Sequence, residues 1–225
     1  MHAGRVLPHR VDVATLGQNG RSTTDVAADP DALALVEIDS VALGLRAVDA
    51  LIKRAPVRLM EANLVEPGRF LVLFAGGVAE VEESLAAARA VAGEALLDNL
   101  FLPFAHPLIL AGLRGRCVQA TADELDTLGV VEGRRIASTL AACDHALKEA
   151  AVDLTGLRVV GGLGGRAYFI VHGPQHDVEA ALEAAEAVLT AAGQLHSVEC
   201  IPRPHDEMVG WLLRPAPFHV GGGAS

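Results

Sequence analysis

The chain has 225 residues, of which 51% are hydrophobic and 4% aromatic, so it can fill one or two cores with small aliphatic side chains. Its formal net charge of −10 leaves no surplus of Lys and Arg to neutralise phosphates, which argues against nucleic acid as the main partner. No apolar run reaches the ~20 residues that span a bilayer, and residues 1–30 lack the apolar core of a signal peptide. We therefore expect a soluble, cytoplasmic protein that does not bind membranes.

The first part of the chain alternates between strand and helix patterns. Residues 1–30 have no periodicity and predict a flexible extension. Ser40 is a suitable N-cap for an amphipathic helix over 41–54. The order is β-α-β-β-α-β, which is the split βαβ, or ferredoxin-like, arrangement of an α+β domain. The predicted elements are strand 33–38, helix 41–54, strand 57–64, strand 70–74, helix 80–92 and strand 96–102.

The second part of the chain has the same order of patterns. The domains are predicted at 31–113 and 128–213, joined by a linker over 114–127 and followed by a flexible tail over 214–225. The predicted elements are strand 128–132, helix 136–149, strand 152–160, strand 166–172, helix 176–191 and strand 196–201.

Residue identities repeat between the two parts in register. Five residues recur 95 positions later, which is too many for chance. Later pairs lie 97 and then 99 positions apart, and the offset changes only in predicted loops. The chain is therefore two tandem copies of one domain. The pairs are Glu37 and Glu132, Asp49 and Asp144, Lys53 and Lys148, Ala55 and Ala150, Val57 and Val152, then Gly68 and Gly165, Arg69 and Arg166, and finally Pro103 and Pro202, His106 and His205.

Motifs for cofactor or metal chemistry are weak in this sequence. The glycines at 161–165 precede a predicted strand, whereas a phosphate-binding loop must open a helix. His172 and His176 straddle a strand end and a turn, and further zinc ligands at a suitable spacing are not evident. The three cysteines have no C-x-x-C spacing, as expected for free thiols. We expect no metal and no cofactor.

Two matched pairs of charged residues allow alternative interpretations. Glu37 and Glu132 stand at equivalent strand ends, where they are either a general acid and base or structural hydrogen-bonding groups. Lys53 and Lys148 each end the first helix of a copy, where a cation complements the helix dipole. Their alternative role follows from a family resemblance.

Both copies resemble the bacterial microcompartment shell domain (BMC domain). Together they resemble the tandem-domain, trimeric shell proteins of the non-permuted, single-layer, propanediol-utilisation-like type, in which three chains form a flat pseudohexameric tile. The resemblance covers about residues 33–213. It is carried by residues 34–37, 47–57, 67–70 and 76–81 in the first copy, and by 131–132, 142–148, 164–166, 173, 177–178 and 201–205 in the second.

The resemblance implies a role for the edge residues and the loops. Lys53, Lys148 and Arg203 are implied to lie on tile edges, although the first copy has Phe104 where the second has Arg203. Two loops are implied to line a central pore. An iron–sulfur-binding relative has a cysteine where Glu66 stands here, which argues against a cluster. The implied pore residues are Val65, Glu66, Pro67, Gly161, Gly162, Leu163 and Gly164.

The leading hypothesis is therefore a structural shell tile and not an enzyme. Its expected partners are two further copies in a homotrimer, hexameric and pentameric shell proteins, and small metabolites that cross the pore. Its expected location is the microcompartment shell in the cytoplasm. The alternatives are a ferredoxin-like small-molecule-binding regulatory protein and a small enzyme that uses Glu37 or Glu132.

Overall fold

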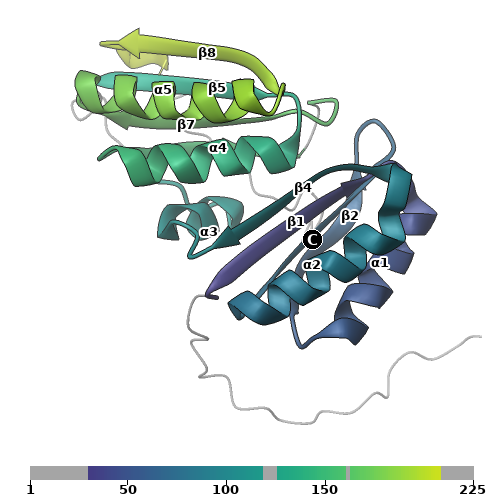
Figure 1. The fold of residues 1–225 in the computed structure, drawn as a ribbon. Helices are drawn as coiled ribbons and strands as arrows, with labels where there is room; N and C mark the ends of the chain where they lie inside the picture. The colour runs from purple at the N-terminus through teal and green to yellow at the C-terminus, as the bar shows by residue number, and fades with distance from the viewer. Residues whose placement is uncertain (1–29, 119–125, 161–162, 209–225) are drawn as a thin grey trace, which may run out of the picture.

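The structure is a computed structural model that describes residues 30–118, 126–160 and 163–208 (Figure 1). The predicted extension up to residue 29, the middle of the predicted linker and the predicted tail lie outside these residues. The described chain forms two four-stranded antiparallel sheets, each accompanied by helices. This confirms two tandem α+β domains of the ferredoxin-like type.

The first sheet has the strand order β2-β3-β1-β4. Helix α1 begins after Ser40, whose hydroxyl accepts the N–H of Leu43 at 3.3 Å, as an N-cap should. Gly44 of α1 lies against Phe70, whose ring leaves no room for a Cβ. The elements are β1 (Ala32–Ile38), α1 (Val41–Arg54), β2 (Arg58–Val65), β3 (Arg69–Gly76), α2 (Val78–Ala92), the 3-10 turn η1 (Gly93–Ala95) and β4 (Leu96–Pro103).

The second sheet has the equivalent order β6-β7-β5-β8. The repeat extends to backbone detail, because Phe104 and Arg203, 99 positions apart, both have positive φ values, 54° and 48°. Their N–H groups donate to the carbonyl oxygens of Asp31 and Asp126 at 2.6 and 2.7 Å. The elements are β5 (Thr127–Gly133), α4 (Ile136–Glu149), β6 (Asp153–Arg158), β7 (Ala167–Gly173), α5 (Gln175–Ala191) and β8 (Leu195–Pro202).

One helix, α3 (Pro107–Leu113), was not predicted from the sequence. Seven residues are too few to display helical periodicity, and so short a helix depends on tertiary packing. His106 caps it, since its Nδ1 accepts the N–H of Leu108 at 3.3 Å. A Cβ at Gly112 of α3 would come within 2.9 and 3.0 Å of the side chains of Leu154 and Leu157, so α3 packs closely on the second domain.

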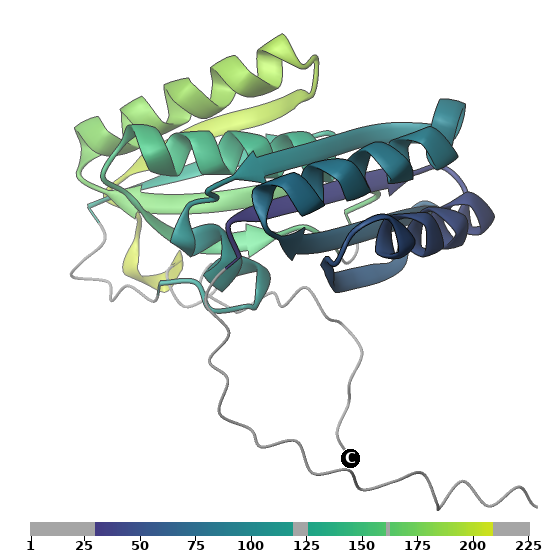
Figure 2. The ribbon, with the colours of Figure 1, turned by 60° about the horizontal axis from the view of Figure 1, so that its bottom comes forward.

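The two domains are arranged head to tail. Helix α4 lies between the second sheet and strand β4 of the first, whereas α1 lies on the side of the first domain away from α4 (Figures 1 and 2). One apolar cluster joins both domains, with Leu33 and Leu73 of the first sheet and Leu140 of α4 among its members. A separate cluster fills the first domain between its sheet and its own helices. Helix α3 is counted with the first domain, and the contact of the first domain with α4 and β6 is called the domain seam below.

Candidate functional site

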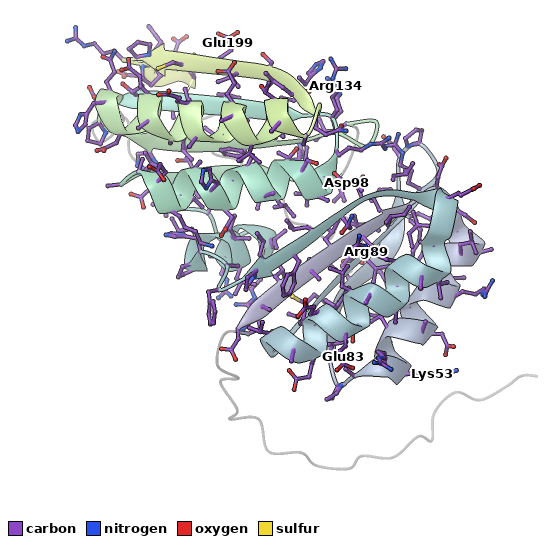
Figure 3. The ribbon with its side chains drawn as sticks, in the orientation of Figure 1. Lys53, Glu83, Arg89, Asp98, Arg134 and Glu199 are labelled. Atoms are coloured by element: carbon purple, nitrogen blue, oxygen red, sulfur yellow. The ribbon has the colours of Figure 1, made fainter. Side chains whose placement is uncertain are left out.

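Two carboxylates of the first domain hold the start of α4. The N-cap residue of α4, Arg135, makes no side-chain cap. Instead, the N–H of Ala137 donates to Glu37 Oε1 at 2.7 Å, and the N–H of Ser138 donates to Asp98 Oδ2 at 3.1 Å. Figure 3 shows Asp98 on β4 beside the start of α4. The two domains are thus joined by two carboxyl side chains at a helix N-terminus, where the helix dipole favours negative charge.

Glu37 has an unusual electrostatic position. Burial raises its pKa from 4.5 to about 7, against the lowering effect of the hydrogen bond from Ala137. The charge of Asp98 also raises this pKa, whereas Arg135 and Arg69 lower it. The side chain is fully buried. Of the two interpretations of this residue, structural hydrogen bonding is the one that the structure shows.

Glu132, the counterpart of Glu37, lies in a different environment. Its Oε1 pairs with Arg166 Nη1 at 2.5 Å, and His196 Nε2 lies 3.8 Å away. About a quarter of its side chain is exposed, at 27%. The repeat therefore places one carboxylate in a closed seam and its counterpart at an open surface.

The other end of α4 carries the predicted edge residue Lys148. Its Nζ donates to Asp144 Oδ2 at 2.5 Å, while Asp144 Oδ1 accepts the N–H of His106 from the first domain at 2.7 Å. Burial lowers the pKa of His106, although the carboxylate of Asp144 opposes this effect. In the first domain Lys53 pairs with Asp49 at 2.7 Å, and here both side chains are more than 60% exposed. Both helices thus carry an aspartate four positions before a lysine, but Asp49 has no domain covering it in the single chain.

Five large apolar side chains of α1 and β2 are exposed, by 37% to 58%. Each has a counterpart 95 positions later that is no more than 4% exposed, because α4 and β6 are covered by the first domain in the domain seam. The exposed set is called the open α1 face below. Its members, with their buried counterparts, are Val41 and Ile136, Leu45 and Leu140, Ile52 and Leu147, Leu59 and Leu154, Leu64 and Val159.

The predicted pore loops of the two domains touch each other. Glu66, Pro67 and Gly68 are exposed at the tip of the turn between β2 and β3. Gly165, with φ +82°, is buried against them, and a Cβ there would come within 2.8 Å of the Glu66 carbonyl oxygen and clash with Arg69 Nη1. A side chain at position 165 is therefore excluded both by its backbone conformation and by its neighbours.

The other predicted pore residues differ in position. Val65 is buried in the apolar cluster that joins the domains. Leu163 is half-buried, and its carbonyl oxygen accepts the N–H of Arg166 at 3.2 Å. Gly164 is exposed, with φ +61°. Gly161 and Gly162 lie outside the described residues.

The remaining sequence candidates do not form a site. His172 is buried with its Nδ1 2.6 Å from Thr155 Oγ1, whereas His176 is exposed beside Asp177. Within residues 30–118, 126–160 and 163–208, no three metal-ligating side chains come together. The described cysteines are free thiols. No helix in the same part of the chain is long and apolar enough to cross a membrane.

Sequence reasoning identified Glu37, Lys53 and Lys148 by their repetition, but it did not identify the groups with which their side chains pair in the structure. Asp49 and Asp144 were visible as repeated residues four positions before each lysine, a spacing that places them on one helix face. Asp98 carried no such signal, because its counterpart in the second copy is Ser197.

Comparison with known proteins agrees with this repeat. The family model described as "BMC domain" matches the chain twice, at residues 32–105 and 127–204. The bacterial microcompartment shell protein PduT of Citrobacter freundii is 33% identical over 177 residues, 79% of this chain and 95% of that protein. The shell protein EutM of Salmonella typhimurium is 34% identical over 84 residues, 37% of this chain and 85% of that protein. The crystal structure of a microcompartment protein from Desulfitobacterium hafniense is 35% identical with a TM-score of 0.70, and covers 79% of this chain and 97% of that one.

Proposed function

Because the chain belongs to the BMC-domain family of bacterial microcompartment shell proteins, we propose that it is a homotrimeric shell tile with a central pore. Its role is structural and not catalytic, as in the shell proteins that it resembles. The alternative of a small-molecule-binding regulatory protein is not favoured by this membership.

The open α1 face is the observation that supports assembly into a trimer. Its five side chains are apolar although they are exposed, and their counterparts are buried by the neighbouring domain in the same chain. Burying apolar surface is the main driving force of association. A second copy that repeats the domain seam covers this face. Contacts of this head-to-tail kind form closed rings when the rotation permits, and six domains, hence three chains, complete the pseudohexamer.

Polar groups support the same arrangement. In the domain seam Asp144 accepts the N–H of His106, and the counterparts of these residues are Asp49 and His205. Asp49 of one copy therefore accepts the N–H of His205 of the next. In the same way Glu132 takes the place of Glu37 and accepts the N–H of Ala42, the counterpart of Ala137, at the start of the next α1.

The perimeter of such a tile carries the proposed edge residues Lys53, Lys148 and Arg203. Figure 3 shows Lys53 at the end of α1 that points away from the second domain. Within the chain, the hydrogen bond from His106 to Asp144 brings the turn at Phe104 near Lys148, which pairs with the same Asp144. Since Arg203 and Lys53 are the counterparts of Phe104 and Lys148, Arg203 of one copy lies beside Lys53 of the next. Phe104 is 70% exposed. The six edges of the tile therefore alternate between one that carries Phe104 beside Lys148 and one that carries Arg203 beside Lys53. Neighbouring hexameric, pentameric and trimeric shell proteins contact edges of both kinds.

The pore is proposed at the meeting point of the two loops. Glu66 stands exposed at its turn, so three copies place three carboxylates around the axis. The glycine loop of the second domain contributes backbone groups between them. Such a ring attracts cations and repels bare anions among the small metabolites that cross it.

The test introduces a charged side chain on the open α1 face. Leu45→Asp is tolerated by the single chain, where this side chain is 58% exposed, but it places a carboxylate in the contact between copies. We expect sedimentation to show monomers with unchanged circular dichroism. Phe104→Asp, an equally drastic change at an exposed site outside that face, is the matched control and keeps the trimer. A Leu45→Asp protein that assembles like the wild type refutes the proposed contact.

A further inference from the structure

The first helices of the two domains are capped in different ways. In α1 the N–H of Leu43 donates to the hydroxyl of Ser40, which precedes the same helix, at 3.3 Å. In α4 the equivalent N–H, that of Ser138, donates to Asp98 Oδ2 of the first domain at 3.1 Å. The residue that precedes α4 at the position of Ser40 is Arg135, which makes no side-chain cap. Helix α1 therefore has a cap of its own, whereas α4 depends on the neighbouring domain.

The strands that present side chains to these helix starts differ in the matching way. Asp98 lies opposite Glu37 in the pairing of β4 with β1, and Ser197 lies opposite Glu132 in the pairing of β8 with β5. Residues paired across antiparallel strands share a face of the sheet. The first domain thus presents two carboxyls to a helix without a cap of its own. The second domain presents one carboxyl and one short hydroxyl at the same two positions.

The charges of the two glutamates are balanced from different sides. Glu37 lies near the guanidinium groups of Arg69 and Arg135, both of which lower its pKa, so one of its two cations comes from the second domain. Glu132 instead pairs with Arg166 of its own domain at 2.5 Å. The first three residues of α1 and the residue before them are uncharged. A second domain therefore needs no cation from the start of the helix on which it docks, and α1 provides none there.

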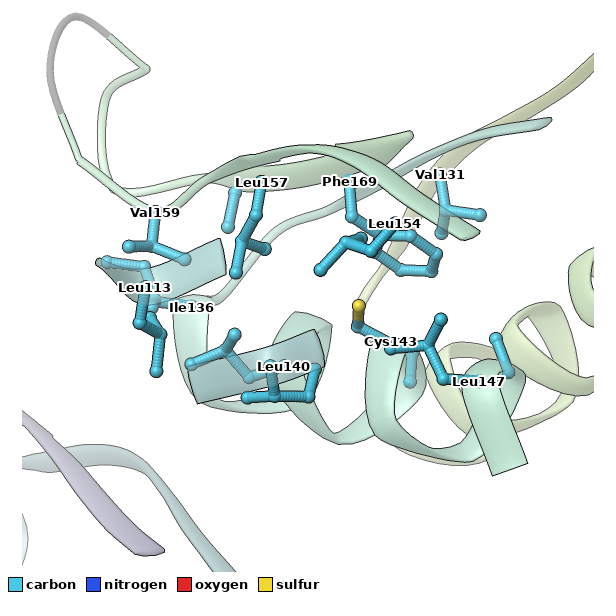
Figure 4. Packing of buried hydrophobic residues seen from close by; sticks show 14 of the residues in the cluster. Leu113, Val131, Ile136, Leu140, Cys143, Leu147, Leu154, Leu157, Val159 and Phe169 are labelled. Atoms are coloured by element: carbon cyan, nitrogen blue, oxygen red, sulfur yellow. The ribbon is translucent and has the colours of Figure 1, made fainter. Parts of the chain in front are cut away.

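The second sheet also has a face that corresponds to the seam face of the first. In the first sheet this face belongs to the apolar cluster that includes α4 and β6, with Leu140 and Leu154 among its members (Figure 4). In the second sheet the equivalent apolar side chains pack on Leu128 and Ile170 but remain half-buried. These half-buried residues, with their buried counterparts, are Val130 and Leu35, Tyr168 and Leu71, Ile201 and Leu102.

We propose that Ser40 and Ser197 form a matched pair that selects the second domain of another copy, and not a first domain, as the partner of α1. A first domain on α1 would bury Asp98 against an N–H that Ser40 already satisfies, and a buried carboxylate without a donor is costly. A second domain on α4 would offer the N–H of Ser138 only the shorter side chain of Ser197. The two kinds of domain therefore alternate around the ring. The inference rests on the proposed homotrimer and identifies what fixes its order.

The test moves the cap from α1 to the partner strand. Ser197→Asp gives the second domain the carboxyl pattern of the first, and it is expected to raise the dissociation constant of the trimer about tenfold or more. Ser40→Ala leaves the N–H of Leu43 uncapped in the contact, with an expected rise of about tenfold. In the double variant the new carboxyl accepts this N–H, so the trimer should bind about tenfold more tightly than either single variant.

Ala187→Asp is the matched control for the added charge. Ala187 is exposed on α5, and its counterpart Ala90 is exposed even though the first domain takes part in the domain seam. The same carboxyl at this position should therefore leave the dissociation constant, measured by sedimentation over a dilution series, unchanged.

The reverse exchange within the chain provides a second measurement. Asp98→Ser should lower the urea midpoint of unfolding, because the N–H of Ser138 loses its acceptor. Arg135→Ser added to this variant should raise the midpoint again, since α4 then has a cap of the α1 kind.

Three results overturn the inference while the homotrimer stands. They are a Ser197→Asp trimer as tight as the wild type, a double variant at positions 40 and 197 no tighter than Ser197→Asp alone, and a reverse exchange in which Arg135→Ser restores no stability. A wild-type chain that is monomeric at every concentration instead overturns the proposed function.

Discussion

Glu37→Gln tests how the domain seam is held together. The substitution keeps the side-chain oxygen that accepts the N–H of Ala137, at 2.7 Å in the wild type, and removes the buried charge. In the wild type the pKa is raised from 4.5 to about 7, so the folded protein binds a proton that the unfolded chain releases between these values. Stability from this carboxyl is fully present below pH 4.5 and is lost as the pH rises through 7.

The size of this loss follows from the displaced pKa. The gap between 4.5 and about 7 corresponds to about 3 kcal/mol of folding free energy. The amide that replaces the carboxyl carries no charge at any pH, so the variant does not lose this folding free energy as the pH rises. The difference in stability between Glu37→Gln and wild type should therefore grow by about 3 kcal/mol, in favour of the variant, between pH 4.5 and 8.

Urea unfolding at fixed protein concentration across this pH range measures the difference, because the titration of other groups cancels between the two proteins. Glu83→Gln is the matched control. It removes an exposed ion pair with Arg54 and should be neutral or destabilising by no more than about 1 kcal/mol. If the stabilities of Glu37→Gln and wild type run parallel from pH 4.5 to 8, the buried carboxyl does not titrate as argued.

Three further predictions concern the edges and the pore. Lys53→Ala combined with Lys148→Ala should leave the trimer intact but abolish flat sheets in electron micrographs. If sheets persist, the two lysines only complement the helix dipole and do not join tiles. Glu66→Gln should keep the trimer and let anions enter a reconstituted shell faster, and equal anion flux would remove the carboxylate ring as the selective element. Gly165→Ala should destabilise the chain by about 1–3 kcal/mol in urea unfolding, since both its positive φ and its neighbours exclude a Cβ. Gly164→Ala, where space is open, isolates the backbone contribution and should cost less.

The sequence allowed the fold to be predicted because the repeat doubled every local signal. The helix predicted over 41–54 has those bounds in the structure, since Ser40, the apolar spacing and the terminal Lys53 all indicated the same element. Helix α3 was missed because its stability comes from contacts with Leu154 and Leu157, more than 40 positions away in the chain.

The candidate site was predicted less completely, for a related reason. A residue type can suggest that Glu37 is important, but its role depends on α4, which is 100 positions away in sequence. The exposure of Leu45 likewise has no signature in the sequence, where it reads as one more core residue of an amphipathic helix. Its meaning appears only when its 58% exposure is compared with the complete burial of Leu140.

The central claim is that three copies close one tile. Multi-angle light scattering of the purified full-length chain at micromolar concentration measures its mass directly. The account predicts three times the 23.4 kDa of one chain, or a whole multiple of that trimer if tiles associate. A stable mass of one or two chains would contradict it.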